Sequence, residues 1–75
     1  SNLTIYPNPV KNGELNISGK DLGNIEIAQI FDYSGKLVQT VSQPFKNNNK
    51  IMLKNLPKGV YILRVDRNSL KFIIQ

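Results

Sequence analysis

A short polar segment at residues 32–36, Asp-Tyr-Ser-Gly-Lys, separates two apolar runs rich in β-branched and aromatic side chains, residues 25–31 and 37–41. Two such runs joined by a few residues that include glycine are typical of a β-hairpin. The Asp32 carboxylate is able to fold back onto backbone N–H groups two residues further on. Gly35 stands where a short hairpin loop often needs a left-handed residue, which glycine adopts without a Cβ clash. The segment therefore predicts a β-hairpin and, with it, a small all-β domain.

The length and composition favour one small domain, residues 1–75. A chain of 75 residues buries only about 60% of the surface that its unfolded form exposes. There is no cysteine to compensate with disulfides, and the formal charge of +5 comes from basic residues that are scattered singly. No apolar run approaches the roughly 20 residues of a spanning helix, and no signal peptide is visible. We expect a C-terminal piece of a longer secreted chain to look like this.

The first strands are short. Residues 3–6 alternate apolar and polar side chains and predict a strand that ends at Pro7, because proline cannot donate to a ladder. The dipeptide Asn12-Gly13 predicts a tight turn with positive φ at both residues. Residues 14–18 alternate again and predict a half-buried strand.

The strand before the hairpin turn shows a change of phase. Ile25 and Ile27 lie on one face of an ideal strand, whereas Ala28 and Ile30 lie on the other. A β-bulge near residues 27–28 would reconcile the two, because one extra residue swaps the faces. Alternatively, the strand begins at Ile27 and is covered on both sides. We slightly favour the bulge.

The second half predicts a loop and three more strands. Residues 43–49 are polar and form a surface loop in which Phe45 is the residue expected to turn inward. Short strands are expected at residues 51–53, 60–65 and 70–75, with a tight turn at 55–59. About seven short strands with regularly spaced turns predict an antiparallel two-sheet β-sandwich with an Ig-like architecture.

The side chains that carry most catalytic chemistry are missing. The sequence has neither His nor Cys, which excludes the usual nucleophile–base pairs and zinc sites. The five acids are spread over different segments, so no paired-carboxylate site is expected. Asp32 alone has a motif around it, and we favour turn capping over calcium binding because calcium needs several oxygen ligands. The sequence therefore predicts a domain that is not an enzyme and has no metal, cofactor or small-molecule substrate.

Nucleic-acid binding deserves consideration because the chain is basic and has three tyrosines. A single-strand binder carries aromatic side chains on an exposed sheet face, interleaved with Lys and Arg. Tyr61 and Phe72 instead fall within apolar alternation, and we expect both in the core. Spaced lysines of the kind found at residues 46, 50, 54 and 58 usually keep a sheet edge soluble. No nucleic-acid partner is predicted.

Several short blocks follow one another along the chain: Tyr6-Pro7-Asn8-Pro9, then Gly13, then Ile30-Phe31-Asp32 with Gly35-Lys36-Leu37-Val38, then Leu56-Pro57-Lys58-Gly59-Val60-Tyr61-Ile62, and finally Lys71-Phe72-Ile73. In this order and spacing they resemble the type A-like C-terminal sorting domain of type IX (Por) secretion cargo. The resemblance covers essentially the whole chain from Leu3 onward. The last strand departs from the family pattern, because it ends in Ile74-Gln75 rather than in a basic residue. The residues that carry the motif are Tyr6, Pro7, Asn8, Pro9, Gly13, Asp32, Gly35, Lys36, Leu56, Gly59, Val60, Tyr61, Lys71, Phe72 and Ile73.

The resemblance implies a non-catalytic signal domain of Bacteroidetes-type bacteria. Such a domain is linked to an N-terminal cargo domain and directs it from the periplasm across the outer membrane, so the cargo is secreted or held at the cell surface. The implied partners are the outer-membrane translocon and a sortase-like peptidase, which usually removes the domain. The alternative is a cell-surface accessory β-sandwich that binds carbohydrate or protein, for which Tyr33 is the natural exposed aromatic.

The final strand offers a way to be recognised. If residues 71–74 lie at a sheet edge, their free N–H and C=O groups are able to pair with a strand of another protein. Lys71 would then also deter aggregation of its apolar neighbours. The alternative is that this strand completes the core, which burial of Phe72 would favour.

Overall fold

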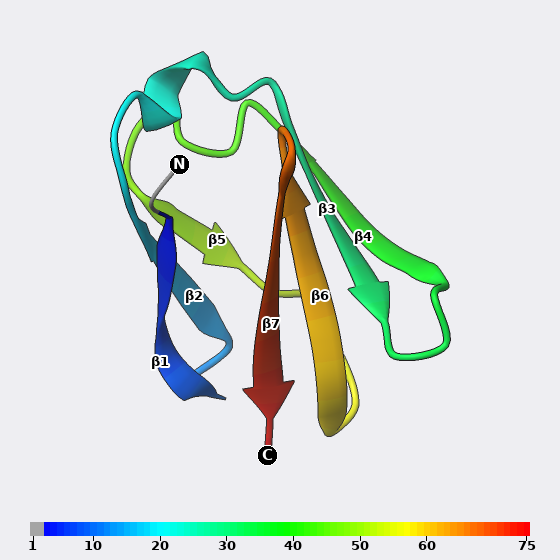
Figure 1. Ribbon diagram of the computed structural model, residues 1–75. Coiled ribbons are helices and arrows are strands. Elements are labelled where there is room, and N and C mark those ends of the chain that lie inside the picture. Colours follow the sequence, from blue (N-terminus) through cyan, green and yellow to red (C-terminus); the bar gives the residue numbers. More distant parts are fainter. Residues whose placement is uncertain (1–2) are drawn as a thin grey trace.

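A computed structural model describes residues 3–75, which form seven strands and one short 3-10 helix (Figure 1). Within this part of the chain no helix is long and apolar enough to cross a membrane. The elements in chain order are β1 (Thr4–Lys11), β2 (Glu14–Ser18), η1 (Leu22–Asn24), β3 (Ile27–Asp32), β4 (Leu37–Ser42), β5 (Lys50–Met52), β6 (Gly59–Val65) and β7 (Asn68–Ile74).

The strands form a nearly closed, sandwich-like sheet in the order β4-β3-β6-β7-β1-β2-β5. One side consists of β4, β3, β6 and β7, and the other of β1, β2 and β5 (Figure 1). The prediction of a small all-β domain with about seven strands is confirmed. The antiparallel prediction has one exception, because β1 meets β7 in parallel at Val10 and Ile74.

The core lies between the two sides. Alternate residues of each strand point inward, as the period of two requires. The rings of Tyr61 and Phe72 stack there with centroids 5.6 Å apart. Phe45 and Leu22 are both buried and close the core from the loops, and the inward position of Phe45 is as predicted. The buried apolar side chains are Leu15, Ile17, Leu22, Ile25, Ala28, Ile30, Phe45, Ile51, Tyr61, Leu63, Val65 and Phe72.

Two of the predicted tight turns, at Asn12-Gly13 and around Gly35, are present. Asn12 and Gly13 both have positive φ, +58° and +66°. Gly35 has a φ of +91° in the turn between β3 and β4, a conformation that β-branched residues resist strongly. Both predictions are confirmed, so the glycines and the asparagine are required by backbone geometry.

The predicted end of the first strand at Pro7 is wrong, because β1 runs on to Lys11. Its pairing with β2 is regular from Thr4 to Tyr6 and resumes only at Lys11. The two prolines, each preceded by a cis peptide bond, occupy the irregular segment between. The ladder between β1 and β2 is interrupted there, so it needs no N–H from either proline, and the prolines do not end the strand.

The bulge predicted near residues 27–28 is also wrong, because β3 begins at Ile27. Ile25 is buried, but it follows the 3-10 helix and belongs to no strand, so it need not keep the alternation of β3. The alternative start at Ile27 is confirmed. The cover expected on both faces is not, because Ile27 is 51% exposed.

A register shift does occur in the hairpin, but in β4. Ile30 pairs with Gln39, whereas the next residue of β3, Phe31, pairs with Leu37. Val38 is therefore the extra residue of a bulge. As a result both Val38 and Gln39 turn toward the interior, Val38 against the core cluster and Gln39 as a buried polar side chain.

The final strand is not an edge strand, so the condition for β-augmentation at residues 71–74 is not met. In the sheet order β7 lies between β6 and β1, and the terminal strands are β4 and β5. Phe72 is fully buried, which confirms the alternative that this strand completes the core.

Candidate functional site

Most of the motif residues meet at one end of the molecule, where the turn after β3, the turn before β6 and the end of β7 lie together (Figure 1). The register brings Asp32 opposite Tyr61, and Tyr61 opposite Phe72. Gly59 and Val60 line a shallow depression together with Asp32. We call this region the motif end of the sheet.

The hinge turn is organised by the Asp32 carboxylate. Its Oδ1 accepts hydrogen bonds from the Ser34 hydroxyl at 2.6 Å, the Ser34 N–H at 2.9 Å and the Lys36 N–H at 3.0 Å. The Ser34 hydroxyl, followed by the Lys36 N–H, lowers the pKa of Asp32 from its ordinary value, because these donors favour the charged form. Asp32 caps the turn, as predicted, and Gly35 allows the backbone to close around it.

Tyr61 connects the turn before β6 to the core. Its hydroxyl donates a hydrogen bond to the carbonyl oxygen of Pro57, and its ring stacks on Phe72. A buried tyrosine that satisfies its hydroxyl in this way fixes the turn relative to the sheet. Leu56, from the same turn, packs against the core cluster. The prediction that Tyr61 and Phe72 are core residues is confirmed.

Asn8, between the two prolines, connects β1 to β7. Its Nδ2 donates to the carbonyl oxygen of Lys71 at 3.3 Å, and its Oδ1 accepts from the N–H of Ile73 at 2.9 Å. The side-chain amide thus makes the two bonds that a neighbouring strand would make. It extends a junction in which the backbones share the single register pair Val10–Ile74.

Gln39 makes an equivalent connection at the other opening of the sheet, and the sequence motifs did not identify it. Its Nε2 donates to the Met52 carbonyl oxygen at 3.0 Å, and its Oε1 accepts from the Lys54 N–H at 2.8 Å. Gln39 is 7% exposed and joins the two terminal strands, β4 and β5. The available signal was a polar residue inside the apolar run at residues 37–41, which the hairpin prediction had treated as an ordinary strand position.

Of the remaining motif residues, Tyr6 lies away from the motif end and Gly13 lies beside it. Tyr6 is exposed and lines a depression formed by β1, β2 and the loop before β5. Gly13 lies in the turn after β1, in a depression shared with Leu56 and the C-terminal residues Ile74 and Gln75. The structure therefore brings together the motif residues of β3, β6 and β7, but not Tyr6.

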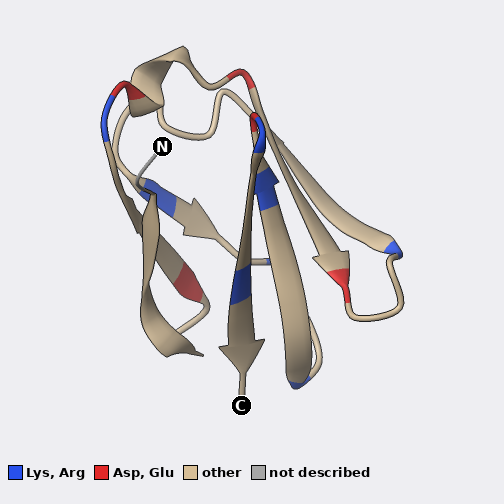
Figure 2. Cartoon of the chain, in the orientation of Figure 1, with Lys and Arg blue, Asp and Glu red and all other residues tan. Residues whose placement is uncertain are grey.

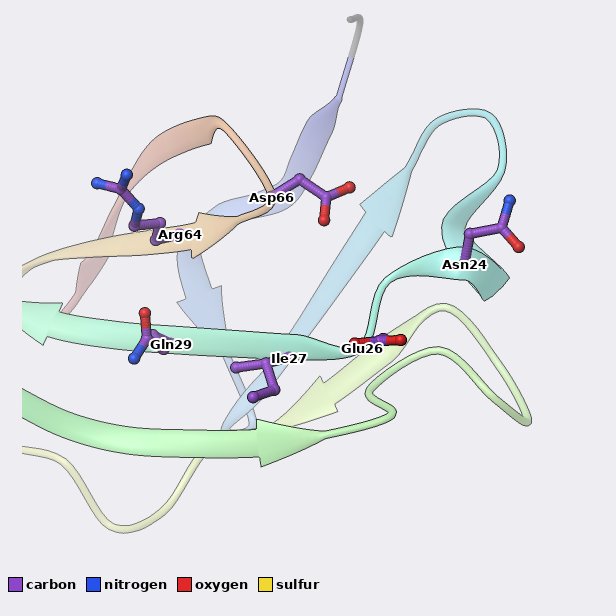
Figure 3. Close-up of a pocket in the computed structure, with 6 residues that line it drawn as sticks. All are labelled: Asn24, Glu26, Ile27, Gln29, Arg64 and Asp66. Atoms are coloured by element: carbon purple, nitrogen blue, oxygen red, sulfur yellow. The ribbon is translucent and has the colours of Figure 1, made fainter.

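A fourth depression lies at the opposite end of β3 and β6 and contains the acids Glu26 and Asp66 (Figure 3). Glu26 precedes β3 and Asp66 follows β6. The Arg64 side chain extends away from the other labelled side chains (Figure 3). Nowhere in residues 3–75 do three or more His, Cys, Asp or Glu side chains group closely enough to hold a metal ion.

Charged residues are spread over strands and loops on both sides of the sheet (Figure 2). Within the described residues one ion pair is formed, between the Lys50 ammonium and the Glu14 carboxylate at 3.4 Å, and an exposed pair of this kind contributes little to stability. The lysines at the motif end, Lys36, Lys58 and Lys71, are exposed.

The molecule is a small all-β domain. Its motif residues are connected by strand pairing and core contacts rather than by a cluster of reactive groups. Residues 4–75 match the family described as the secretion system C-terminal sorting domain. The chain is also 32% identical over 72 residues to beta-agarase A of Zobellia galactanivorans, an alignment that covers 95% of this chain and 13% of that protein.

The chain belongs to the family of secretion system C-terminal sorting domains. It is therefore a sorting signal of type IX secretion, and the protein that carries it is secreted or placed at the cell surface across the outer membrane. The resemblance inferred from the motif blocks is confirmed. Membership also implies interaction with the secretion system and attachment to a cargo domain, while the family is generally non-catalytic.

Proposed function

We propose that this domain acts as a folded, non-catalytic tag that is recognised by the outer-membrane translocon and is removed from its N-terminally linked cargo by a sortase-like peptidase. The observation that supports this most is the motif end. Motif residues from three distant segments meet there, and most of them hold the fold together rather than form a reactive site. A tag needs a stable fold with a recognisable surface and no chemistry of its own.

The distribution of roles among the motif residues supports recognition of a folded surface. Asp32, Tyr61 and Phe72 are engaged in internal contacts. Lys36 and Lys71 are exposed, while Val60 and Ile73 are half-buried and do not belong to the core cluster. The first group stabilises the fold that presents the surface, and the second group is available to a partner.

The proposal is tested by attaching the domain to the C-terminus of a folded, secretable reporter in a host with type IX secretion. We expect the reporter outside the outer membrane only when the domain is attached. The exported reporter should be smaller than the fusion, because the peptidase removes the tag. Equal export of the reporter with and without the domain would reject the proposal.

The accessory-module alternative receives less support. A carbohydrate platform needs several exposed aromatic side chains on one surface. The exposed tyrosines, Tyr6 and Tyr33, come from β1 and from the turn after β3, and they line different depressions. They do not form a shared platform.

A further inference from the structure

The outer face of the four-stranded side carries apolar residues that the core does not use. In β6 the inward residues are Tyr61, Leu63 and Val65, so Val60 and Ile62 point outward by alternation. Phe31 of β3 and Ile73 of β7 are outward by the same criterion. Among the described residues, these four are half-buried but are not part of the core cluster or packed against it.

The strand register places these outward residues next to one another. Phe31 lies opposite Ile62 in β6 and opposite Leu37 in β4. Val60 lies opposite Ile73, one step closer to the motif end. Cross-strand neighbours on one face have Cβ atoms roughly 4.5–5.5 Å apart. The five side chains therefore form one continuous surface over β4, β3, β6 and β7, which we call the outer apolar face.

The most exposed apolar side chains border this face. Leu37 is 45% exposed and Tyr33 is 81% exposed. Tyr33 lines the same depression as Val60 and Lys58, so it extends the face around the hinge turn. Single exposed apolar residues are ordinary, but a contiguous exposed apolar patch on a small soluble domain marks an interaction site.

The rim of the outer apolar face is basic. Lys71 lies directly opposite Ile62 in the adjacent strand, Lys36 precedes Leu37, and Lys58 precedes β6 (Figure 2). None of these three ammonium groups forms an ion pair among the described residues. The acid at this end, Asp32, already accepts hydrogen bonds within the hinge turn. Glu26 and Asp66 lie at the other end of the same side (Figure 3).

We propose that the outer apolar face is where the secretion machinery docks, on a protein surface with an apolar centre and Asp or Glu side chains around it. This inference rests on the proposed function and adds the location and chemistry of the contact. The apolar centre supplies burial, and the lysine rim favours a partner of opposite charge, because complementary rims guide encounter and exclude wrong partners. The last strand of the sequence, β7, contributes through the side chains of Lys71 and Ile73 rather than through a free backbone edge.

The apolar part is tested with the double variant Val60→Thr/Ile62→Thr in the reporter fusion. Threonine keeps the β-branched shape that strands favour while adding a hydroxyl. The matched control is Ile27→Thr, which makes the same change at an exposed residue at the other end of β3. We expect the double variant to lower export about tenfold or more, as loss of a central contact does, and the control to leave export unchanged.

The rim is tested with Lys58→Glu/Lys71→Glu against Lys58→Arg/Lys71→Arg. Both lysines are exposed, so neither change disturbs the core. Charge reversal should lower export about tenfold or more, and the arginine variant should retain it. Thermal melting of each purified domain shows whether it is folded. Reversal variants that melt like the parent and still export normally would overturn the proposal even if the threonine variant failed to fold.

Two further measurements address other occupants of the face. Sedimentation velocity would reveal self-association, and flotation with vesicles of phosphatidylcholine and phosphatidylglycerol would reveal lipid binding. We expect a monomer that does not float. A dimer abolished by Val60→Thr/Ile62→Thr, or vesicle binding abolished by Lys58→Glu/Lys71→Glu, would assign the face to a second copy or to lipid instead. If the parent domain itself fails to export the reporter, the proposed function fails. If the parent domain exports the reporter and the folded variants export it equally well, this inference alone fails.

Discussion

Replacing Gln39 by methionine should destabilise the domain through the loss of two hydrogen bonds at the junction of β4 and β5. Methionine keeps the length and unbranched shape of the side chain, so the change removes polar contacts without opening a cavity. The Met52 carbonyl and the Lys54 N–H both lose their partner, since Gln39 binds them at 3.0 and 2.8 Å. No other side chain bridges these two terminal strands with a hydrogen bond in the described chain.

The magnitude follows from the partial burial of this junction. A fully buried polar group left without a partner costs about 1–3 kcal/mol. Gln39 itself is 7% exposed, but Met52 and Lys54 are exposed residues, so water is able to replace part of what is lost. We therefore take the lower end of that range for each group, about 2 kcal/mol in total. For a domain of this size, that corresponds to a fall in Tm of about 8–16 °C.

The matched control is Gln29→Met on the neighbouring strand β3. Gln29 is half-buried on the outer face, and its side chain forms no hydrogen bond with any of residues 3–75. Circular dichroism melts and urea titrations of both variants give the two changes in stability. We expect Gln29→Met to stay within about 0.5 kcal/mol of the parent. If the two variants lose equal stability, Gln39 does not close the sheet as described.

Four other changes test the account. Gly35→Val should cost more than about 1 kcal/mol, because valine resists the positive φ at this position; an unchanged urea midpoint would contradict the turn geometry. The pKa of Asp32 is lowered from 3.8, so the stabilisation that its carboxylate gives the fold is present above that pH and is lost as the pH falls through the lower folded-state value. Asp32→Asn should therefore flatten the acid side of the Tm–pH profile. An unaltered profile would count against the cap. Millimolar calcium should not change the Tm, because a ligand specific for the folded state must raise it; a clear rise would revive calcium binding at Asp32. A short polar extension after Gln75 should leave melting unchanged and block export, because the C-terminus lies at the motif end beside Leu56; normal export would show that the machinery does not contact this end.

The class of fold and the turns were predictable because they depend on local chemistry. Asn12-Gly13 and the Asp32-to-Lys36 turn require particular φ values and side-chain acceptors, and both are visible in a few adjacent residues. Apolar alternation also predicted two core positions. Tyr61 and Phe72 were placed in the core for that reason, and both are buried there.

The errors arose where tertiary pairing decides the outcome. Proline ends a strand only where a ladder needs its N–H, and β1 has no regular partner around Pro7. The change of phase at Ile25 arises because this residue follows a short 3-10 helix, not because β3 contains a bulge. The bulge that does occur is at Val38, and because Val38 is itself apolar, the sequence of its strand does not reveal it.

The two amide connections show the same limit for the candidate site. Asn8 was noticed only as part of a motif, and Gln39 was not noticed. Their roles depend on residues 65 and 15 positions away, Ile73 and Lys54. Sequence separation of this size carries no local signal, so only the folded sheet reveals which polar side chains replace backbone pairing.

The most direct test of the central claim compares export of one reporter fusion in two hosts that differ only in the outer-membrane translocon of type IX secretion. The fraction of reporter outside the cell is measured by immunoblotting of medium and cell surface against the periplasm. The account predicts export in the intact host and periplasmic retention in the host without the translocon, with export restored when the translocon gene is returned. Equal export from both hosts would contradict it.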